Sequence, residues 1–419
     1  MANGMGSLMV GATGLRSSQT ALNTTAHNLS NVNTEGYTRQ QITFADSTYA
    51  NVFSKSLNKG KYGLGVDIDA ISRIRNEFID RSYRTESSRL GFYESQANAV
   101  YEVEDWFGEM QGVTYQEHIT NLYNAVNELT KNPTSTIARS SLIQNATAFI
   151  DRSEAIYSGL KDYQVTLNTE VNNMVEKINS LGQKIYNLNK GIVKVEAEGV
   201  ERANDLRDSR DLALDELSKY IDIDYYETKD GEVIVSAENV PFITKNDIAK
   251  MSVREEGTYG LLIPQWEGYQ QDVYNFDKQA NNANDTDKGK LKGLLIARGV
   301  IEVNYTDIPV MPERADYDLT TEQGMAEYNS AMDAYQQKQD YYNKYIEPSA
   351  ILSAIAGFDK LVNGIVTAMN DVLCPETTMD TTKELTDADG NILKAEKYVY
   401  NASTHDVLYD SHANAVAGK

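Results

Sequence analysis

Leucine recurs every seven residues near the start of the chain, at Leu8, Leu15, Leu22 and Leu29. We call these four leucines the leucine stripe. Small or amide residues lie between them and complete a three-four alternation: Ala12, Gln19 and Ala26. This spacing places the leucines along one narrow face of a helix. The flanking positions are small and polar, so the helix cannot bury itself inside its own globule. The pattern therefore predicts an assembly helix that needs a partner.

An asparagine-rich turn follows this helix. Asn31 and Asn33 are poor residues for a helix interior and favour turns, so we expect the helix to stop near Asn31. Gly36 supplies a backbone conformation that is closed to other residues. We therefore expect the chain to reverse or kink over residues 31–40, here called the signature turn, which also contains Tyr37 and Arg39.

The next part of the chain passes from an extended pattern to a helical one. Val66, Ile68 and Ile71 alternate with polar residues as they would in a strand. Apolar residues then recur at helical spacing, which predicts one helix over about 76–110 and a second over about 115–129. The second helix is expected to end before an Asn-Pro pair, because the residue before a proline disfavours the helical conformation.

The longest helical pattern covers about 136–198. Its apolar series takes one extra residue between Leu167 and Val171, a stutter that locally unwinds a left-handed supercoil. This pattern predicts a long, rod-like helix that packs on one or two neighbours. A broad apolar stripe at 349–373 predicts another helix, which is a plausible partner for the long one.

Two regions have the period-two pattern of strands. Residues 222–264 alternate, with Asp230 and Gly231 as the turn of a hairpin. After Pro375 the chain becomes polar, with short strand-like runs at 399–400 and 407–409. These patterns predict a β-hairpin module inside the helical body and the beginning of a further β-rich domain.

The predicted fold class is mainly α with β parts, α+β. We expect an elongated multi-helix bundle with long coiled-coil-like helices, a β-hairpin-rich module and the start of a further β-rich domain. Five regions are expected. The assembly helix with the signature turn covers 1–45, the helical body 46–225 and its β-hairpin-rich part 226–290. A returning segment at 291–374 holds an insertion at 300–347 and the bundle helix at 349–373, and an outer β-rich domain begins at 375–419.

The N-terminal motif resembles the signature of the axial proteins of the bacterial flagellum, which are the rod, hook and hook-associated proteins. The matching residues are Gly14, Leu15, Gln19, Ala21, Leu22, the run 27–34, Gly36, Tyr37, Arg39 and Gln40. His27 stands where these proteins more often have asparagine. The signature is shared across the group, so by itself it indicates only the superfamily.

Two later motifs narrow the resemblance to the hook-associated protein 1 family. Residues 204–211 resemble its Asn-Asp-Leu, Arg-Asp motif, and 293–298 resemble its glycine-leucine-leucine-x-x-arginine motif. The family usually has aspartate after that arginine, where this chain has Gly299. We expect Asp205 to cap the start of a helix, with Arg207 and Arg210 in exposed pairs along it.

The resemblance implies a structural protein that joins hook and filament outside the cell. It would self-assemble through terminal helices, with the leucine stripe and Asn31, Asn33, Gly36, Tyr37 and Arg39 as the assembly residues. Expected partners are copies of itself, hook protein, the next hook-associated or filament proteins and a dedicated export chaperone. Export would use the flagellar apparatus without a cleaved signal peptide. Family members close with a C-terminal helix that pairs with the N-terminal one, so we expect this chain to be truncated.

Two other interpretations remain open. The first is that the chain is another axial protein, namely a hook, distal rod or filament subunit. Hook and rod proteins tend to lack a helix as long as 136–198, and flagellin lacks the signature turn. A third interpretation, from a different class, is an extracellular adhesin or enzyme displayed through residues 300–419.

Charge and composition exclude several partners. The 419-residue chain has a net charge of −22, which argues against nucleic acid and anionic membrane surfaces. No stretch approaches the roughly 20 apolar residues that a membrane span needs, and the N-terminus lacks a secretory signal pattern. The single cysteine, Cys374, excludes an internal disulfide framework.

The chain offers little catalytic chemistry. Its four histidines are scattered, without metal-ligand spacing: His27, His118, His405 and His412. The carboxylates at 205, 208 and 211 resemble the ligands of a metal site. Acidic residues near the start of a helix are better explained by their favourable interaction with the helix dipole. We therefore expect no enzyme activity, no metal and no cofactor.

Overall fold

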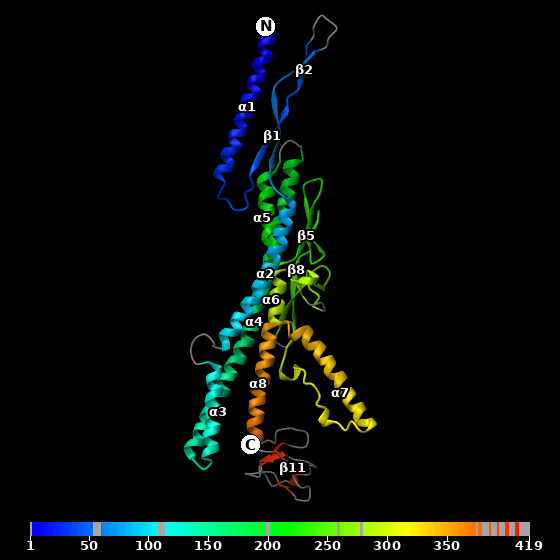
Figure 1. The fold of residues 1–419 in the computed structure, drawn as a ribbon. Coiled ribbons are helices and arrows are strands. Elements are labelled where there is room, and N and C mark those ends of the chain that lie inside the picture. Colours follow the sequence, from blue (N-terminus) through cyan, green and yellow to red (C-terminus); the bar gives the residue numbers. More distant parts are fainter. Residues whose placement is uncertain are drawn as a thin grey trace. The chain divides into compact units, whose positions relative to one another are not determined.

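A computed structural model describes residues 2–52, 60–107, 114–197, 202–257, 260–276 and 280–373, together with five short strands after residue 375 (Figure 1). The chain divides into two compact units. Unit 1 comprises Met1–Glu104, Asp162–Glu302 and Pro348–Ile351, and unit 2 comprises Asp105–Lys161, Val303–Glu347 and Leu352–Lys419. Cys374, His405 and His412, which the sequence singled out, lie outside the described residues.

The fold class is mainly α with small antiparallel sheets, as predicted. The α-helices are α1 (Ala2–Ser30), α2 (Glu77–Phe107), α3 (Tyr115–Lys131), α4 (Thr136–Glu196), α5 (Asn204–Tyr220), α6 (Lys290–Arg298), α7 (Glu322–Tyr341) and α8 (Ala350–Leu373). The predicted helices at 76–110, 115–129, 136–198 and 349–373 correspond to α2, α3, α4 and α8. Short 3-10 turns lie at Asn282–Asn284, Tyr305–Asp307 and Arg314–Asp316, and a π-helical turn lies at Tyr342–Ile346.

The strands pair only with antiparallel neighbours. They are β1 (Gln40–Asp46), β2 (Tyr49–Val52), β3 (Gly60–Gly63), β4 (Val66–Arg73), β5 (Ile223–Glu227), β6 (Val233–Ala237), β7 (Val240–Ile243), β8 (Met251–Glu256), β9 (Leu261–Trp266), β10 (Gln271–Asp272), β11 (Glu376–Thr378), β12 (Leu385–Thr386), β13 (Ile392–Leu393), β14 (Val399–Asn401) and β15 (Val407–Tyr409). In unit 1 the sheets are β1-β4, β2-β3, β5-β6-β7 and β10-β9-β8; in unit 2 they are β11-β14-β15 and β12-β13.

The predicted hairpin at Asp230 and Gly231 joins β5 to β6. The two strands pair from Ile223 with Ala237 to Glu227 with Val233. Gly231 has a φ of +83°, which other residues rarely adopt. The predicted alternation at Val66, Ile68 and Ile71 is confirmed as well, since β4 covers these residues and pairs with β1.

The stutter in α4 is part of a continuous buried stripe. Leu167 and Val171, on either side of the extra residue, are both buried, as are Ile178 and Ile185 further along the helix. At Gly182 the ring of Phe242 from β7 lies so close that an added Cβ would come within 2.5 Å of it. The helix therefore approaches β7 closely at a glycine, where no side chain separates the two.

A row of asparagines on α4 holds the edges of the sheets. Asn168, Asn179 and Asn189 each use the amide group to pair with the strand backbone, as a neighbouring strand would. Asn179 donates to Met251 O at 2.8 Å and accepts from Met251 N at 2.9 Å. Asn189 pairs in the same way with Val233, at 2.8 and 3.1 Å. Asn168 donates to the carbonyl of residue 260 and accepts from the amide of residue 262. Backbone groups at these edges are thereby satisfied inside the protein.

The motif at 293–298 forms α6, which packs closely on α2. An added Cβ on Gly293 would lie 2.5 Å from Phe92 O, so only glycine permits this approach. Gln96 of α2 donates to Gly293 O at 3.0 Å, and Ser95 donates to Lys290 O at 3.1 Å. The glycine of this motif therefore serves helix packing.

An aromatic cluster forms the core of unit 2. The Phe358 ring of α8 lies 5.0 Å from Tyr115 of α3 and 5.4 Å from Phe107 of α2, and Tyr115 also contacts Phe149 of α4 at 5.7 Å. Tyr115 satisfies its buried hydroxyl through Ser153 Oγ at 3.0 Å. Edge-to-face ring contacts of this kind each add about 0.5–1.5 kcal/mol beyond area burial.

One expectation about α8 is wrong. By length and composition α8 is apolar enough to cross a membrane, over Ala350–Val372, whereas the sequence was expected to contain no such stretch. The core helix of a soluble protein meets the same test, and the first part of α8 is buried in this way at Leu352, Ile355 and Phe358. Its later part is more exposed, with Leu361 at 44% and Val372 at 79%.

Candidate assembly site

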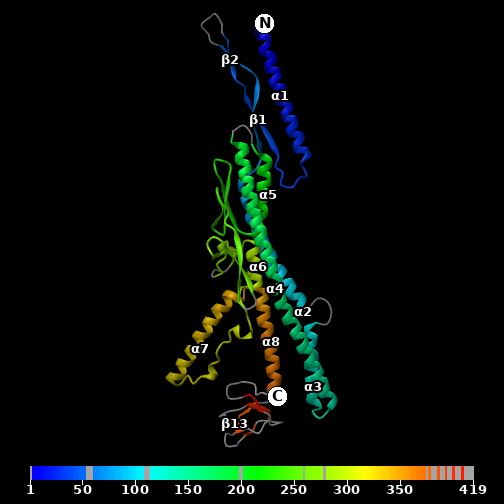
Figure 2. The ribbon, with the colours of Figure 1, turned by 180° about the vertical axis from the view of Figure 1, so that it is seen from behind.

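Helix α1 carries the leucine stripe on an exposed face. Leu8, Leu15, Leu22 and Leu29 are 76, 73, 63 and 74% exposed. The helix ends at Ser30, as predicted, and the two ribbon views both place it alongside β1 (Figures 1 and 2). Four large apolar side chains at heptad spacing are therefore uncovered in this chain.

The opposite side of α1 is anchored on β4 through small residues. Ser17 is buried and its hydroxyl donates to Val66 O at 3.3 Å, while Thr13 donates to Leu64 O at 3.3 Å. Gly65, with a φ of +111°, has no room for a side chain because a Cβ would overlap Thr13 Oγ1. The small, polar flanks thus do find a partner in this chain, which the sequence interpretation did not anticipate.

Asn28 fixes the end of α1 to the strand that follows the signature turn. Its amide donates to Gln40 O and accepts from Gln40 N, both at 2.9 Å, and Tyr37 OH donates to Asn28 Oδ1 at 2.7 Å. His27 meets the Tyr37 ring edge-on at 5.5 Å. The predicted residue Tyr37 therefore helps to fix the end of α1, and Asn28 is a site residue that the prediction omitted.

The other predicted turn residues have distinct environments. Asn31 closes the turn by donating to His27 O at 3.0 Å and accepting from Thr34 Oγ1 at 3.1 Å. Asn33 is exposed, as is the side chain of Arg39, whose carbonyl accepts from Ile74 N at 2.9 Å. Asn33 and Arg39 thus lie at the surface, where a neighbouring molecule can reach them.

The signature turn rests on α5, the helix formed by the 204–211 motif. Gly36 has a φ of +79°, and a Cβ there would meet Leu212 Cβ at 3.1 Å. Thr38 N donates to Asp208 Oδ2 at 3.0 Å. Asn204 Nδ2 donates to Ile71 O of β4 at 2.9 Å. We call this contact between the signature turn, β4 and α5 the joint.

Three aspartates on one face of α5 meet three arginines from β4, the following loop and α2. Arg73 donates to Asp208 and Asp211, both at 2.7 Å. Burial raises the pKa of Asp211, but Arg75 and Arg73 outweigh that effect, so its pKa is lowered below the ordinary value. This carboxylate is therefore ionised at neutral pH, and its charge is compensated.

The same network of paired aspartates and arginines continues toward α2. Arg84 is buried and donates to Asp215 Oδ1 at 2.7 Å. Arg75 pairs with Asp80 at 2.5 Å and reaches Asp211 and Asp215 at 3.5 Å. Sequence reasoning missed all three arginines, because nothing in their local spacing shows which distant residues they meet.

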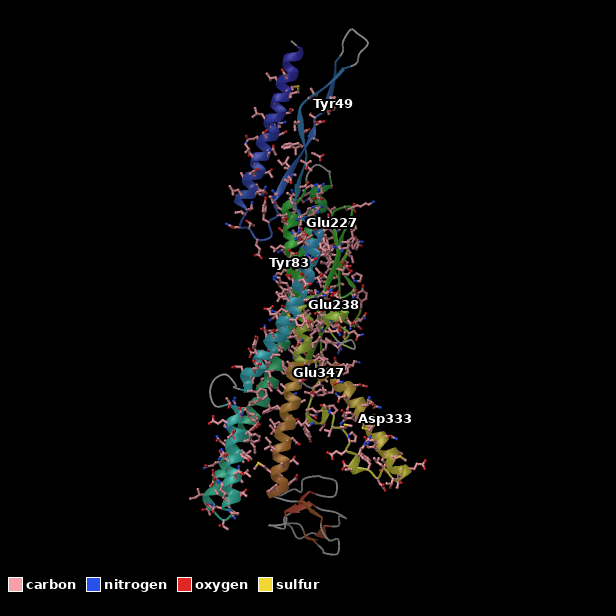
Figure 3. The ribbon with its side chains drawn as sticks, viewed as in Figure 1. Tyr49, Tyr83, Glu227, Glu238, Asp333 and Glu347 are labelled. Carbon is pink, nitrogen blue, oxygen red and sulfur yellow. The ribbon has the colours of Figure 1, made fainter. Side chains whose placement is uncertain are left out.

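Arg207 and Arg210 are not in exposed pairs along α5, which corrects the prediction. Arg210 is only 1% exposed and donates to Gly231 O at 2.6 Å and to Glu227 at 2.8 Å. Arg207 donates to Glu196 at 2.8 Å and to Glu227 at 2.6 Å. Figure 3 shows Glu227 beside the upper part of α5. Both arginines therefore tie the β5–β6 hairpin to α5.

Asp205 lies in the first turn of α5, as expected, but it does not cap the helix. The N-cap residue is Ala203, without a side-chain capping bond. Asp205 instead accepts from Gln40 Nε2 at 3.4 Å and lies 4.0 Å from His27 Nε2. Its side chain is 78% exposed, so this contact closes the outer edge of the joint.

Arg298, in the second motif, is buried without a carboxylate contact among the described residues. It donates to Asn168 Oδ1 at 2.6 Å, Leu262 O at 2.9 Å and Gly299 O at 3.1 Å. Burial lowers its pKa to about 10. Gly299 ends α6 with φ +80° and ψ 156°. The place where the family usually has aspartate is therefore a backbone position suited to glycine.

The described residues contain no group of three or more His, Cys, Asp or Glu side chains that could hold a metal ion. The carboxylates at 208 and 211 are instead engaged by arginine. The arrangement is therefore one of anchoring: it holds α1 by one side and leaves the other side exposed.

Comparison with known proteins gives one match that includes α5 and another that includes most of α1 and the signature turn. Residues 100–333 match the family profile described as "Flagellar hook-associated protein FlgK helical domain", and residues 8–38 match that of "Flagella basal body rod protein". The chain is 30% identical to flagellar hook-associated protein 1 of Bacillus subtilis over 310 residues, which cover 71% of this chain and 61% of that protein.

Two further matches are more distant. Flagellar hook-associated protein 1 of Salmonella typhimurium is 26% identical over 213 residues, or 50% of this chain and 37% of that protein. The hook junction protein FlgK of Burkholderia pseudomallei has a solved structure that aligns with a TM-score of 0.43 at 18% identity, covering 51% of this chain and 38% of that one. The chain thus spans less than two thirds of these relatives. Because the helical-domain profile covers more than half of its residues, the chain belongs to the FlgK family of flagellar hook-associated proteins.

Proposed function

We propose that this protein is a structural component of the bacterial flagellum that forms the junction between hook and filament. It would act outside the cell by self-assembly through α1. Membership of the FlgK family supports the flagellar role, and the match of residues 8–38 to the rod profile supports a place in the axial structure.

The observation that carries the proposal is the exposure of the leucine stripe on a helix that is anchored from behind. Covering a leucine fully is favourable by roughly 1.5–3 kcal/mol, and four of them are 63–76% exposed. An exposed seam of this kind indicates a partner helix. We infer that this partner comes from terminal helices of this protein and of neighbouring subunits.

The contacts at the joint fix the orientation of α1, and therefore of the leucine stripe, within unit 1. Asn28, Gly36 and Asp208 fix α1 to the body of unit 1 through the contacts described above. We propose that residues 1–45 form the assembly segment, 46–374 the body and 375–419 part of an outer domain. The proposed partners are copies of itself, hook protein, the next hook-associated or filament proteins and an export chaperone. Export would use the flagellar apparatus.

We propose no catalytic role. The family is one of structural flagellar proteins, and the buried charged groups at the joint pair with one another. An adhesin or enzyme would instead present an accessible reactive group. A peptidase or glycosidase activity of the purified chain that is abolished by a single substitution would favour that interpretation.

Deletion of the gene tests the proposal in cells. We expect hooks without filaments, with flagellin lost to the medium, as seen by electron microscopy and by immunoblotting of culture supernatants. Normal filaments would exclude the junction role. Cells without hooks would favour a hook or distal rod subunit, the second candidate, which the rod-profile match also supports.

Substitutions on α1 test the mechanism. Leu15→Ser with Leu22→Ser should leave the stability of the isolated protein nearly unchanged, since both side chains are exposed, yet should abolish filament formation. Asn23→Ala, an exposed change on the same helix that leaves all four leucines in place, is the matched control and should retain filaments. Equal filament numbers for both variants would contradict a role for the stripe.

A further inference from the structure

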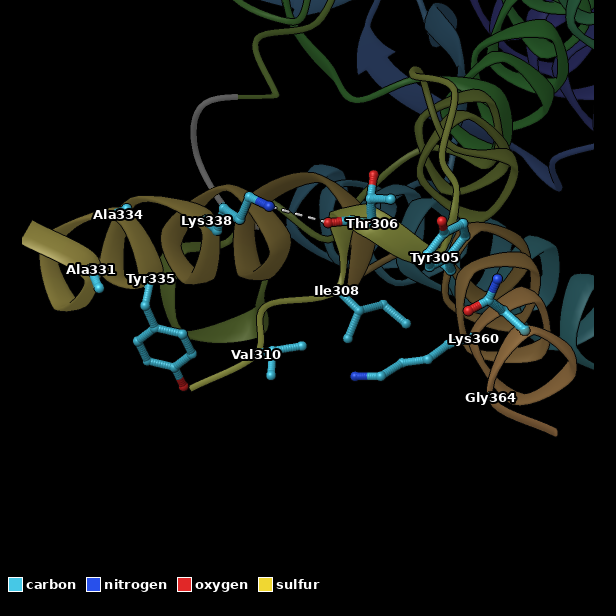
Figure 4. Close-up of a pocket in the computed structure, with 11 residues that line it drawn as sticks. Tyr305, Thr306, Ile308, Val310, Ala331, Ala334, Tyr335, Lys338, Lys360 and Gly364 are labelled. Atoms are coloured by element: carbon cyan, nitrogen blue, oxygen red, sulfur yellow. Dashed lines mark hydrogen bonds between the residues drawn. The ribbon is translucent and has the colours of Figure 1, made fainter. Parts of the chain in front are cut away.

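An open groove in unit 2 lies on the insertion that the proposed function does not use. The segment of residues 305–310 forms its floor, α7 one wall and α8 the other (Figure 4). Its volume is about 600 Å³. Ile308, Val310 and Tyr335 provide apolar surface, and Figure 4 shows these side chains pointing toward the same space. The groove can therefore accommodate several side chains of another segment.

The groove is basic although the protein is acidic. Lys338 and Lys360 line it, and neither has a carboxylate within 4 Å in the described part of the chain. Lys338 donates only to the backbone oxygen of Thr306, at 3.3 Å. The nearby carboxylate of Asp359 accepts from Tyr305 N at 2.9 Å. Two exposed ammonium groups beside an apolar surface favour an acidic segment with apolar residues.

A segment of this type exists in the same insertion. Residues 311–325 expose Met311, Leu319 and Met325 at 59, 36 and 47%. Four acidic residues accompany them: Glu313, Asp316, Asp318 and Glu322. The one basic residue, Arg314, is engaged with Tyr328. With four acidic residues against one basic residue, the segment is negatively charged at neutral pH.

The segment does not fill the groove of its own chain. None of its residues lines the groove, because the segment leads into the first turn of α7 while the groove lies against residues 331–338 further along that helix. An acidic, apolar surface and a basic, apolar groove thus lie at different places on one unit.

We propose that the groove receives residues 311–325 of a second copy of this chain. The contact would be head to tail, since each copy offers its groove to one neighbour and its segment to another. Contacts of this kind generate rings when the rotation closes. The inference rests on the proposed function, because it assigns a lateral contact between subunits that α1 has already brought together.

Cysteine cross-linking in assembled flagella tests the contact. On a Cys374→Ser background, Gly364→Cys places a thiol in the groove and Met311→Cys places one on the segment. An added side chain at Gly364 meets nothing within 4 Å, and Met311 is exposed. With both substitutions, a short bismaleimide should give a ladder of dimers and larger species, whereas each single substitution should give monomer.

Gly357→Cys combined with Met311→Cys is the matched control. Gly357 is also on α8 with open space around it, but it does not line the groove. We expect at least a tenfold lower yield of cross-linked species. A similar yield would show random collision and would overturn the inference. Monomer alone from the Gly364 and Met311 pair would also overturn it, while filaments in those cells would leave the junction role intact.

Charge reversal supplies a second measurement. Lys338→Glu with Lys360→Glu should abolish the ladder by placing like charges together. Glu313→Lys with Asp316→Lys, added to that variant, should restore it. A groove that instead binds an acidic glycan would give no restoration, and that result would count against a second copy as the occupant.

Discussion

The backbone N–H of Thr38 donates a hydrogen bond of 3.0 Å to the carboxylate of Asp208. This bond joins the signature turn to the 204–211 motif, which is about 170 residues away in the sequence. Arg73 holds the same carboxylate from the other side at 2.7 Å. The signature turn and the 204–211 motif therefore form one physical contact, and that contact sets the direction of α1.

The first prediction concerns the central carboxylate of this network. Asp211→Asn should lower the free energy of unfolding by about 3 kcal/mol, because removing one partner of a buried network leaves arginine charge uncompensated. The side chain of Asp211 is only 12% exposed. Urea unfolding followed by circular dichroism measures the change.

Asp205→Asn is the matched control, six residues earlier on the same helix. Its carboxylate is 78% exposed, so the loss should stay below about 0.5 kcal/mol. Equal losses for the two variants would show that the network contributes nothing beyond general charge on α5.

The second prediction concerns the turn itself. Gly36→Ala should destabilise the joint by about 1–2 kcal/mol, since Gly36 has φ +79° and faces Leu212. The amide of Thr38 should then exchange faster with deuterium. Gly14→Ala, in open space on α1, should have the opposite sign and stabilise the helix by about 0.5–1 kcal/mol. An unchanged Thr38 amide would contradict the role assigned to Gly36.

Periodic features of the fold were predictable from the sequence. The ends of α1, α3 and α8 agree closely with their apolar patterns, and the stutter between Leu167 and Val171 is buried as expected. These features are local: the same few residues carry the pattern and form the element. The exposed leucine stripe was predictable for the same reason.

Long-range contacts of polar residues were not predictable. Arg207 and Arg210 have the spacing of exposed helix pairs, but the β5–β6 hairpin covers them and supplies Glu227. The amide pairing of Asn179 with Met251 likewise depends on which strand edge lies beside α4. Composition alone does not determine which backbone groups an asparagine meets, so these contacts required the structure.

The third prediction concerns pH. Glu238 is largely buried, with Lys292 at 4.0 Å and one carboxylate oxygen without a hydrogen bond among the described residues. Burial raises its pKa to about 7, and the Asp222 charge adds to this effect against the influence of Lys292 and Lys288. The folded protein therefore holds this proton more tightly than the unfolded chain does.

The sign of the effect follows from this difference. The stability that Glu238 contributes is fully present below about pH 4.5 and is lost as the pH rises through 7, by about 3 kcal/mol. Glu238→Gln should remove this dependence, so the variant should be more stable than wild type at pH 8. Glu267→Gln, at an exposed position, is the control and should leave the pH profile unchanged. Parallel profiles for wild type and Glu238→Gln would contradict the assignment.

The last prediction concerns Gly299, where the family resemblance leads one to expect aspartate. Its backbone, at φ +80° and ψ 156°, lies in a region that only glycine occupies at low cost. Gly299→Ala should therefore destabilise the protein by about 2 kcal/mol. Gly299→Asp carries the same strain but adds a carboxylate next to Arg298, which is fully buried and donates to carbonyl oxygens and Asn168. If the new carboxylate forms an ion pair with the Arg298 guanidinium, the aspartate variant should be less destabilised than the alanine variant in urea unfolding. If the two are equally destabilised, backbone geometry alone explains why this chain has glycine. An alanine variant as stable as wild type would refute both the strain and its consequence for the end of α6.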